Sequence, residues 1–339
     1  MKFDVYGNAH VSYMAAYANE LRYGFWDHML NKWFTTTVDR TGGFCSLVLD
    51  SHQRPHISYL GYGGGLTYAR WDGASWIKQK IPIKARTIEF YTSIALDQDD
   101  HPSISFYEVD NAEGERLARM RTVWWNGKFW ALTTVDSTRG SGKFNSIAVD
   151  SKGHSHVAYA VVNYESASVR YAYWNSESWK TEVLEGVGSS APSHPGEPPN
   201  QACWSVSMLL DKDDNPHITY TDVSHLLVKY ATKKSGHWKI EPVDSLGREG
   251  YPDRNGIGLD DEGNPYISYY DASAGLLKMA HRQGQKWAVE VVDGGSVGLQ
   301  SSLQIDHGTI WVIYTDEANG GLKFARRTLG ATDAPGQEK

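Results

Sequence analysis

The sequence lacks the features that mark several large classes of protein. It has no apolar run of about eighteen residues, so we expect no membrane-spanning segment. It has no glycine-rich phosphate loop and no H-E-x-x-H, C-x-x-C or G-x-S-x-G motif, which excludes P-loop nucleotide hydrolysis, zincin proteolysis, dithiol redox chemistry and the common serine-hydrolase elbow. Its net charge of −7 provides no basic stripe, so we expect no nucleic-acid partner.

What the sequence does contain is a repeat, whose fullest form is D-x(5)-H-I-S-Y. Seven copies follow one another, and each leads from an aspartate to a tyrosine or phenylalanine. The aspartates are Asp4, Asp50, Asp97, Asp150, Asp211, Asp260 and Asp306, and the aromatic residues are Tyr13, Tyr59, Phe106, Tyr159, Tyr220, Tyr269 and Tyr314.

Each copy predicts four antiparallel strands. Two β-branched and aromatic runs, separated by a few Asp, Gly, Asn and Pro residues, indicate a hairpin. A third apolar run follows, for example residues 227–231, and a fourth opens with tryptophan and closes with Val-Asp, for example residues 238–244. Units of this size that cannot bury their own faces are typical of a radial array of sheets.

The sequence therefore predicts an all-β, seven-bladed β-propeller of four-stranded antiparallel blades. It forms a single domain over residues 1–329, with blades starting near residues 4, 50, 97, 150, 211, 260 and 306. The last unit has no clear fourth run after Ala325, and we expect residues 330–339 to form a disordered tail.

The turn before the fourth strand often reads Gly-x-x-Trp, as at residues 73–76, 127–130 and 284–287. It resembles a degenerate Asp-box turn of the sialidase-like and BNR propellers, with Trp71 or Trp125 in the place of the aspartate of the box. The resemblance implies the fold alone, because propellers host unrelated functions.

Residues that recur from blade to blade are more typical of scaffold than of an active site. Four histidines occupy the same position on the second strand: His10, His56, His156 and His217. We interpret them as structural residues that hydrogen-bond within or between blades. They lie on separate blades without a local pair of ligands, so they predict no metal site.

Departures from the repeat are the better guide to function. Loops from the fourth to the first strand and from the second to the third open on one face of a propeller, and three of them are long here: residues 184–203, 245–255 and 107–116. Long irregular loops in compact domains commonly bind ligands. With two turns at residues 221–225 and 270–273, they predict a site over blades five and six.

The candidate residues of this site combine histidine, arginine, aromatic and acidic side chains. They are His194, Trp204, Asp222, His225, Arg248, Glu249, Asp253, Arg254, Tyr270 and Asp271, with Glu108 and Asp110 from the loop of blade three. Asp222, Asp271 and Asp316 recur at equivalent places, so a turn cap is an alternative explanation for them. His225 and Arg254 have no counterparts in other blades, which favours function.

The first hypothesis for function is cleavage of an acidic, uronate-containing polysaccharide by β-elimination. This reaction needs a cation for the uronate carboxylate, a base for the C5 proton and an acid for the leaving oxygen. Arg254 would be the cation, His225 and Tyr270 would share the other two roles, and His194 is a further catalytic candidate. The remaining candidates would bind substrate.

The set resembles, in residue type, that of some polysaccharide lyases. Several of these enzymes, the ulvan lyases among them, are seven-bladed propellers that use His, Tyr and Arg at the funnel mouth. The positions that hold two of their histidines correspond to Gly42 and Tyr62 in this sequence.

Three other functions stay open. A glycoside hydrolase would use two carboxylates, with candidates Glu108, Asp110, Asp222, Asp271 and Asp316. A lectin would bind a sugar or peptide on aromatic and acidic loops without changing it. An interaction scaffold would show an exposed apolar patch instead of converging titratable groups.

Cofactors, compartment and assembly follow from smaller signals. No metal is assigned, although calcium would suit the Asp-rich turns at residues 97–100 and 211–214, which aspartate also forms without a metal. Cys45 and Cys203 precede the first strands of blades two and five, across the ring, so we expect two free thiols. The chain begins in mid-repeat, which suggests a trimmed, secreted or periplasmic domain, and we expect a monomer with a polysaccharide or oligosaccharide partner.

Overall fold

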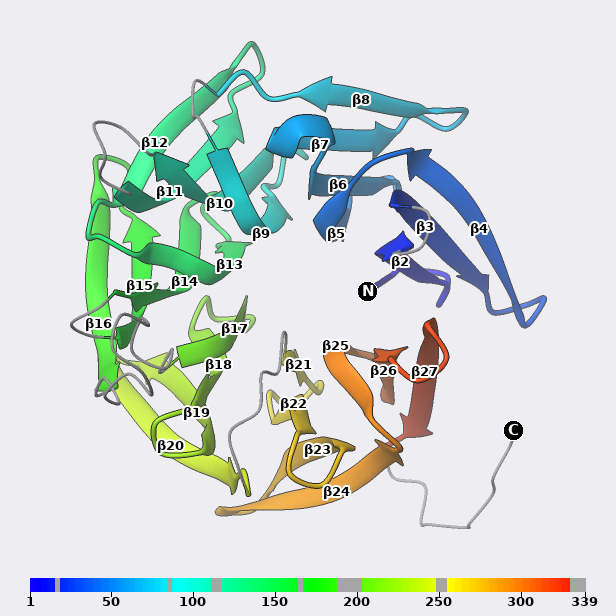
Figure 1. Ribbon diagram of the computed structural model, residues 1–339, viewed down its shortest axis with the longest axis vertical. Coiled ribbons are helices and arrows are strands. Elements are labelled where there is room, and N and C mark those ends of the chain that lie inside the picture. Colours follow the sequence, from blue (N-terminus) through cyan, green and yellow to red (C-terminus); the bar gives the residue numbers. More distant parts are fainter. Residues whose placement is uncertain are drawn as a thin grey trace.

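Seven sheets stand around a central axis in the computed structural model (Figure 1). The structure describes residues 1–15, 19–83, 87–110, 117–163, 167–187, 203–247 and 255–329, with the backbone alone at residues 87–90, 110, 117, 187 and 204. All strand pairs are antiparallel, and the first strand of each blade lies innermost. The prediction of an all-β, seven-bladed propeller is confirmed.

Consecutive strands are neighbours in every blade, as the repeat predicts. Blades one to three are β1 (Lys2–Phe3), β2 (Ala9–Ala15), β3 (Glu20–Asp27) and β4 (Lys32–Asp39); β5 (Gly43–Leu49), β6 (Pro55–Leu60), β7 (Leu66–Trp71) and β8 (Trp76–Lys80); and β9 (Thr87–Leu96), β10 (Pro102–Asp110), β11 (Leu117–Trp125) and β12 (Trp130–Asp136). Blades four and five are β13 (Ser141–Val149), β14 (Ser155–Val162), β15 (Ala167–Trp174) and β16 (Trp179–Val187); and β17 (Cys203–Leu210), β18 (Pro216–Asp222), β19 (Leu227–Lys234) and β20 (His237–Ser245). Blades six and seven are β21 (Gly256–Leu259), β22 (Pro265–Asp271), β23 (Leu276–Gln283) and β24 (Lys286–Gly294); and β25 (Val297–Asp306), β26 (Thr309–Asp316) and β27 (Gly321–Thr328).

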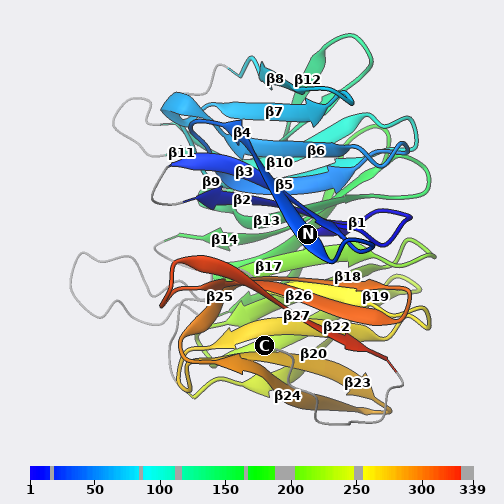
Figure 2. The same ribbon diagram turned by 90° about the vertical axis from the view of Figure 1, so that its right-hand side faces the viewer.

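The strands run across the thickness of the ring, so their turns gather at its two ends (Figure 2). We call the end that carries Asp222 and Asp271 the upper face, and the end that carries Asp50 and Asp211 the lower face. Among the described residues the one helical element is the short 3-10 turn η1 (Tyr62–Gly64), and no helix is long and apolar enough to cross a membrane.

The hydrophobic core lies between blades, not inside any one of them. One cluster joins Val169 and Tyr171 of blade four to Ile218 and Tyr220 of blade five. Equivalent clusters join the other successive blade pairs from one to seven. A single blade therefore cannot bury its own apolar faces, and neighbouring sheets stabilise one another.

The four recurring histidines each join an aspartate and a tyrosine in one hydrogen-bonded chain. In blade two, His56 Nε2 lies 3.3 Å from Asp50 Oδ2, and its Nδ1 lies 2.6 Å from the hydroxyl of Tyr68. The same chain is formed by Asp4–His10–Tyr23, Asp150–His156–Tyr171 and Asp211–His217–Tyr230. The prediction that these histidines are structural is confirmed.

Each tyrosine of these chains also contacts the following blade. Tyr68 meets Trp130, the first residue of β12, edge to face at 5.4 Å between ring centroids. The pairs Tyr23–Trp76, Tyr171–Trp238 and Tyr230–Trp287 repeat this geometry. The tryptophan that opens the fourth strand thus connects two blades, which accounts for many of the thirteen tryptophans.

Blade seven has three strands among the described residues, and the ring closes there by aromatic packing. Phe324 of β27 contacts Trp26 and Trp33 of blade one at 5.6 and 6.0 Å, and Phe3 of β1 contacts Trp311 of β26 at 5.2 Å. The missing fourth run of the last repeat therefore leaves a shorter sheet without opening the ring.

Neither cysteine forms a disulfide bond, as expected. Cys203 is fully buried, and burial raises the pKa of its thiol well above the usual value. It is an inert core residue.

Candidate functional site

Several residues of the predicted site lie outside the described part of the chain. These are His194, Arg248, Glu249, Asp253 and Arg254. Trp204 and Asp110 lie in β17 and β10 with their backbone alone described. The convergence of the long loops over blades five and six therefore stays a prediction, and the geometry below concerns the remaining candidates.

His225 and Asp222 form a directed pair on the upper face of blade five. Asp222 ends β18 and is fully buried, whereas the side chain of His225, in the turn that follows, is 62 % exposed. His225 Nδ1 lies 2.8 Å from Asp222 Oδ2, and the backbone N–H of His225 donates to Asp222 Oδ1 at 3.1 Å. A neutral imidazole held in this way donates from Nδ1 and keeps its Nε2 lone pair available.

A buried ion pair holds Asp222 in place. Lys229 of β19 lies opposite Tyr220 in the sheet register, and its ammonium is 2.8 Å from Asp222 Oδ2 and 2.7 Å from Glu185 Oε1 of blade four. Burial alone would lower the pKa of Lys229, but its hydrogen bonds to Asp222 and Glu185 raise it, so the ammonium stays charged. Tyr220 donates to Glu185 Oε2 at 2.6 Å, and burial together with this carboxylate raises the pKa of Tyr220.

The same network recurs in blade six. Lys278 is 2.7 Å from Asp271 and 3.3 Å from Asp244 of β20, and Tyr269 donates to Asp244 at 2.7 Å. Burial would raise the pKa of Asp271, but the ammonium of Lys278 holds it below its usual range. Asp271 also accepts from the backbone N–H of Ser273 at 3.0 Å, which fits the turn-cap interpretation.

Blades seven and three extend the pattern. In blade seven, Lys323 lies 3.1 Å from Asp316, and Tyr314 donates to Asp293 of blade six. In blade three, Glu108 takes the equivalent place, buried 2.6 Å from the guanidinium of Arg121. The upper-face carboxylates are thus neutralised by a cation from the third strand of the same blade.

Sequence reasoning missed these cations, although a signal was present. The third strands read L-V-K-Y, L-L-K-M and G-L-K-F, which places Lys229, Lys278 and Lys323 at one repeat position. An alternating lysine inside an apolar strand, next to an acid on a neighbouring strand, indicates a buried ion pair.

Tyr270 lies one residue before Asp271 in β22 and pairs with Leu277 of β23. Its side chain is partly exposed, and successive side chains of a strand point to opposite faces of the sheet. Its side chain thus points to the opposite face of the sheet from that of Asp271. Tyr270 and His225 lie in neighbouring blades, both near the upper-face end of the second strand.

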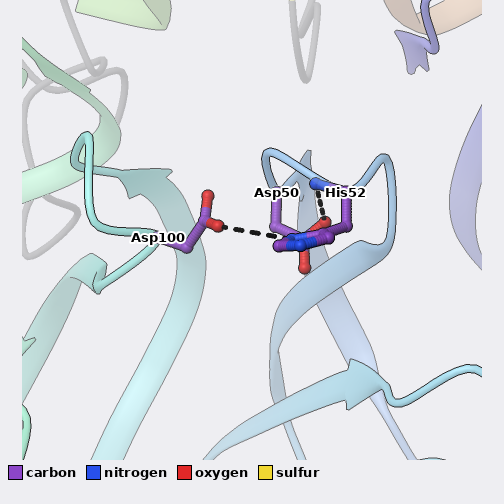
Figure 3. Close-up of side chains that lie close together, drawn as sticks. All are labelled: Asp50, His52 and Asp100. Atoms are coloured by element: carbon purple, nitrogen blue, oxygen red, sulfur yellow. Dashed lines mark hydrogen bonds and ion pairs between the residues drawn. The ribbon is translucent and has the colours of Figure 1, made fainter.

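The one group of possible metal ligands among the described residues lies on the lower face, away from the predicted site. Asp50 and His52 of blade two face Asp100 of blade three (Figure 3). The carboxylate oxygens of Asp50 and Asp100 already accept hydrogen bonds from the protein. Asp50 accepts from the backbone N–H of His52 at 2.9 Å, and Asp100 accepts from the hydroxyl of Ser51 at 2.6 Å.

Blades four and five repeat the Asp100 linkage without a histidine. Ser151 donates to Asp214 through its backbone N–H and its hydroxyl, and Lys152 stands where blade two has His52. Lysine cannot serve here as a metal ligand, so the serine–aspartate linkage is a contact between blades. The Asp-rich turns thus have a structural explanation that needs no calcium.

No family model matches the sequence, and no curated protein matches it either. Solved structures do match. The chain is similar to the BP39L lectin from Burkholderia pseudomallei, with a TM-score of 0.65 and 11 % identity over 96 % of this chain and 92 % of that one. The likeness is one of fold.

Two further structures support that conclusion. A Hadza microbial sialidase matches with a TM-score of 0.56 and 10 % identity, over 92 % of this chain and 74 % of its own. A mutant of the Aleuria aurantia lectin in complex with Fucα1-6GlcNAc matches with a TM-score of 0.52 and 12 % identity, over 86 % of this chain and 97 % of its own. The expected likeness to sialidase propellers is confirmed at the level of fold.

Proposed function

We propose that the protein binds an acidic polysaccharide on its upper face over blades five and six and cleaves it by β-elimination. The observation that carries the proposal is the Asp222–His225 pair. Asp222, held by Lys229, fixes the imidazole through Nδ1 and leaves an exposed Nε2 as a base. No other described carboxylate at this repeat position is followed by an exposed histidine, so the pair departs from the repeat.

The elimination step would use these groups as follows. Nε2 of His225 takes the C5 proton of a uronate unit, the C–H electron pair forms the C4–C5 double bond, and the C4–O bond breaks. Tyr270 would return a proton to the leaving oxygen, and Arg254 would bind the uronate carboxylate. Such a polymer substrate agrees with a secreted or periplasmic location.

Hydrolysis is less well supported by the described residues. A retaining or inverting glycosidase needs two available carboxyl groups a few ångströms apart. Glu108, Asp222 and Asp271 are all buried, and each lies within 2.8 Å of a lysine or arginine. Their oxygens are therefore committed to ion pairs that stabilise the blades.

Sugar binding without catalysis is the second candidate. The bond from the His225 backbone to Asp222 is also a turn cap, so His225 could shape the loop without reacting. Two of the similar structures are lectins by name, and a lectin would use the same upper-face loops to hold the sugar.

The experiment offers the protein a panel of uronate-containing and neutral polysaccharides and follows ultraviolet absorbance of the unsaturated product together with new reducing ends. We expect absorbance to rise, and we expect His225→Ala to slow it about 10²- to 10⁴-fold, the usual contribution of a general base. His307→Ala is the matched control, because His307 is also exposed and also bonds an aspartate, Asp306 at 3.0 Å, but on the lower face.

Three results would contradict the proposal. Equal rates for His225→Ala and the control would remove His225 from the reaction. Reducing ends without absorbance would indicate hydrolysis. Binding to a polysaccharide without either signal would establish the lectin.

A further inference from the structure

Two adjoining hollows open on the lower face, at the opposite end of the ring from the proposed elimination site. The larger, of about 390 Å³, lies between blades four and five, and the smaller, of about 140 Å³, lies between blades three and four. The larger falls in the size range of small-molecule sites. Trp174, the last residue of β15, lines both hollows and joins them.

Aromatic side chains form the walls. Tyr173 stacks on Tyr171 at 6.0 Å on the side of blade five. Trp174 turns the other way, because successive side chains of a strand alternate, and it meets Trp124 of blade three at 6.3 Å and Trp179 at 5.7 Å. Trp124, Tyr173, Trp174 and Trp179 all keep part of their surface exposed. They form a strip of partly exposed aromatic side chains across blades three and four.

Four Asp and Lys side chains line the larger hollow. Three of them, Asp150, Asp214 and Lys233, bond neighbouring side chains, and Lys152 is the fourth. Asp214 accepts from Ser151 at 2.9 Å, and the ammonium of Lys233 lies 2.6 Å from Glu182. The imidazole of His154 bonds Ser176 at 2.8 Å through Nε2. Paired charges offer little net attraction to an anion, whereas aromatic faces beside polar rims suit a neutral ligand rich in hydroxyl groups.

The two repeat places that Tyr173 and Trp174 occupy are both aromatic in blades one, three and four, as Phe25–Trp26, Trp124–Trp125 and Tyr173–Trp174, and they are not in blades five to seven. The repeat places of Tyr173 and Trp174 hold Thr232 and Lys233 in blade five. In blades six and seven both places carry basic side chains: His281 and Arg282, and Arg326 and Arg327. The hollows thus lie where two neighbouring blades, three and four, both carry the aromatic pair, whereas the scaffold of blades five to seven is built without it.

We propose that Trp174 and its aromatic neighbours form a binding groove for neutral sugar units, with the two hollows receiving adjacent units of an oligosaccharide. The groove shares with the proposed function only the class of ligand. Pro216, on its rim, and Asp222, under His225, are the two ends of β18, and six residue steps of about 3.3 Å place them about 20 Å apart. The groove therefore binds independently of the elimination site.

The test is saturation-transfer NMR and calorimetry of the whole chain with neutral gluco-, manno- and galacto-oligosaccharides of two to six units. We expect at least one to bind, and we expect Trp174→Ala to weaken it about tenfold or more, since tenfold corresponds to about 1.4 kcal/mol. Trp71→Ala is the matched control: Trp71 has the same place in blade two and the same edge contact, 5.5 Å to Trp76, but it lines neither hollow. Tyr173→Leu, which keeps apolar bulk, should weaken binding as well.

The outcomes separate this inference from the proposed function. Binding that survives His225→Ala but is lost in Trp174→Ala supports the groove, whatever happens to elimination. Equal affinities in Trp174→Ala and Trp71→Ala would overturn it. So would the absence of binding to every neutral oligosaccharide, or binding that only acidic ones show and that salt abolishes.

Discussion

The buried histidines make a specific prediction about acid stability. Each accepts a hydrogen bond from a tyrosine hydroxyl at Nδ1 and donates one from Nε2 to an aspartate, which is the bonding pattern of a neutral imidazole. Burial lowers the pKa of all four, and the neighbouring aspartate only partly offsets this: His10, His56, His156 and His217. The unfolded chain, with a histidine pKa of about 6.5, therefore takes up protons before the folded chain does.

The direction and size of the effect follow. The contribution of the four neutral histidines to the free energy of unfolding is fully present above about pH 6.5. It falls as the pH drops below about 6.5, until the pH passes the pKa values of the histidines in the folded protein. Each proton taken up by the unfolded chain alone changes the free energy of unfolding by about 1.4 kcal/mol per pH unit, so four give a slope of up to about 5 kcal/mol per pH unit.

The assay is urea unfolding, followed by tryptophan fluorescence, from pH 7.5 to pH 5. His217→Gln should reduce the slope by about one proton, whereas replacing the exposed His237 should leave it unchanged. A stability that is constant or rises between pH 6.5 and pH 5.5 would refute the reasoning. It would mean that the folded protein holds the histidines as charged partners of their aspartates.

Two further predictions concern single side chains. Lys229→Met should lower the free energy of unfolding by about 3 kcal/mol in the same urea assay. This is at the low end for a broken buried ion pair, because Asp222 keeps its bond to His225. The control is Lys234→Met, which is exposed on the same strand and should change the free energy of unfolding by less than about 0.5 kcal/mol. Gly140→Ala should destabilise the protein by more than about 2 kcal/mol, since a Cβ there would lie 2.2 Å from the backbone oxygen of Val162. Gly153 has nearly the same positive φ but open space around it, so Gly153→Ala should cost about 1 kcal/mol. Equal losses in the two variants would show that backbone strain alone is responsible.

The fold could be predicted from the sequence because its information is repeated. Seven copies of one motif report the same four strands, and an error in one copy is corrected by the others. The structural role of His56 and its three counterparts could be predicted for the same reason. The partners were harder, because Tyr68 and Trp130 are separated from His56 by different loops, and only the packing of one blade on the next brings them together.

The site was less accessible to sequence reasoning. Asp222 and Asp271 are attractive as catalytic carboxylates when their neighbours along the chain are considered. The residues that neutralise them, Lys229 and Lys278, come from the next strand, and the second acids, Glu185 and Asp244, come from the preceding blade. A charge inside an apolar strand is satisfied across the sheet, so its partner is invisible until the register is known.

Positions outside the repeated ion pairs are where the blades of this ring can differ in function. An ion pair that recurs in blades five, six and seven cannot differ between them without loosening a contact between blades, so specificity must come from residues added to the network. His225 is such an addition on the upper face, because it uses an oxygen of Asp222 that Lys229 already neutralises. Trp174 on the lower face is a different case, because tryptophan makes the equivalent ring contact in blades one to three, and Trp174 is distinguished by the two hollows that it lines. His225 can be removed while the repeated contacts stay in place, so its variants report on function more directly than variants of the carboxylates do. Replacing Trp174 removes one repeated edge contact, and comparison with Trp71→Ala corrects for that loss.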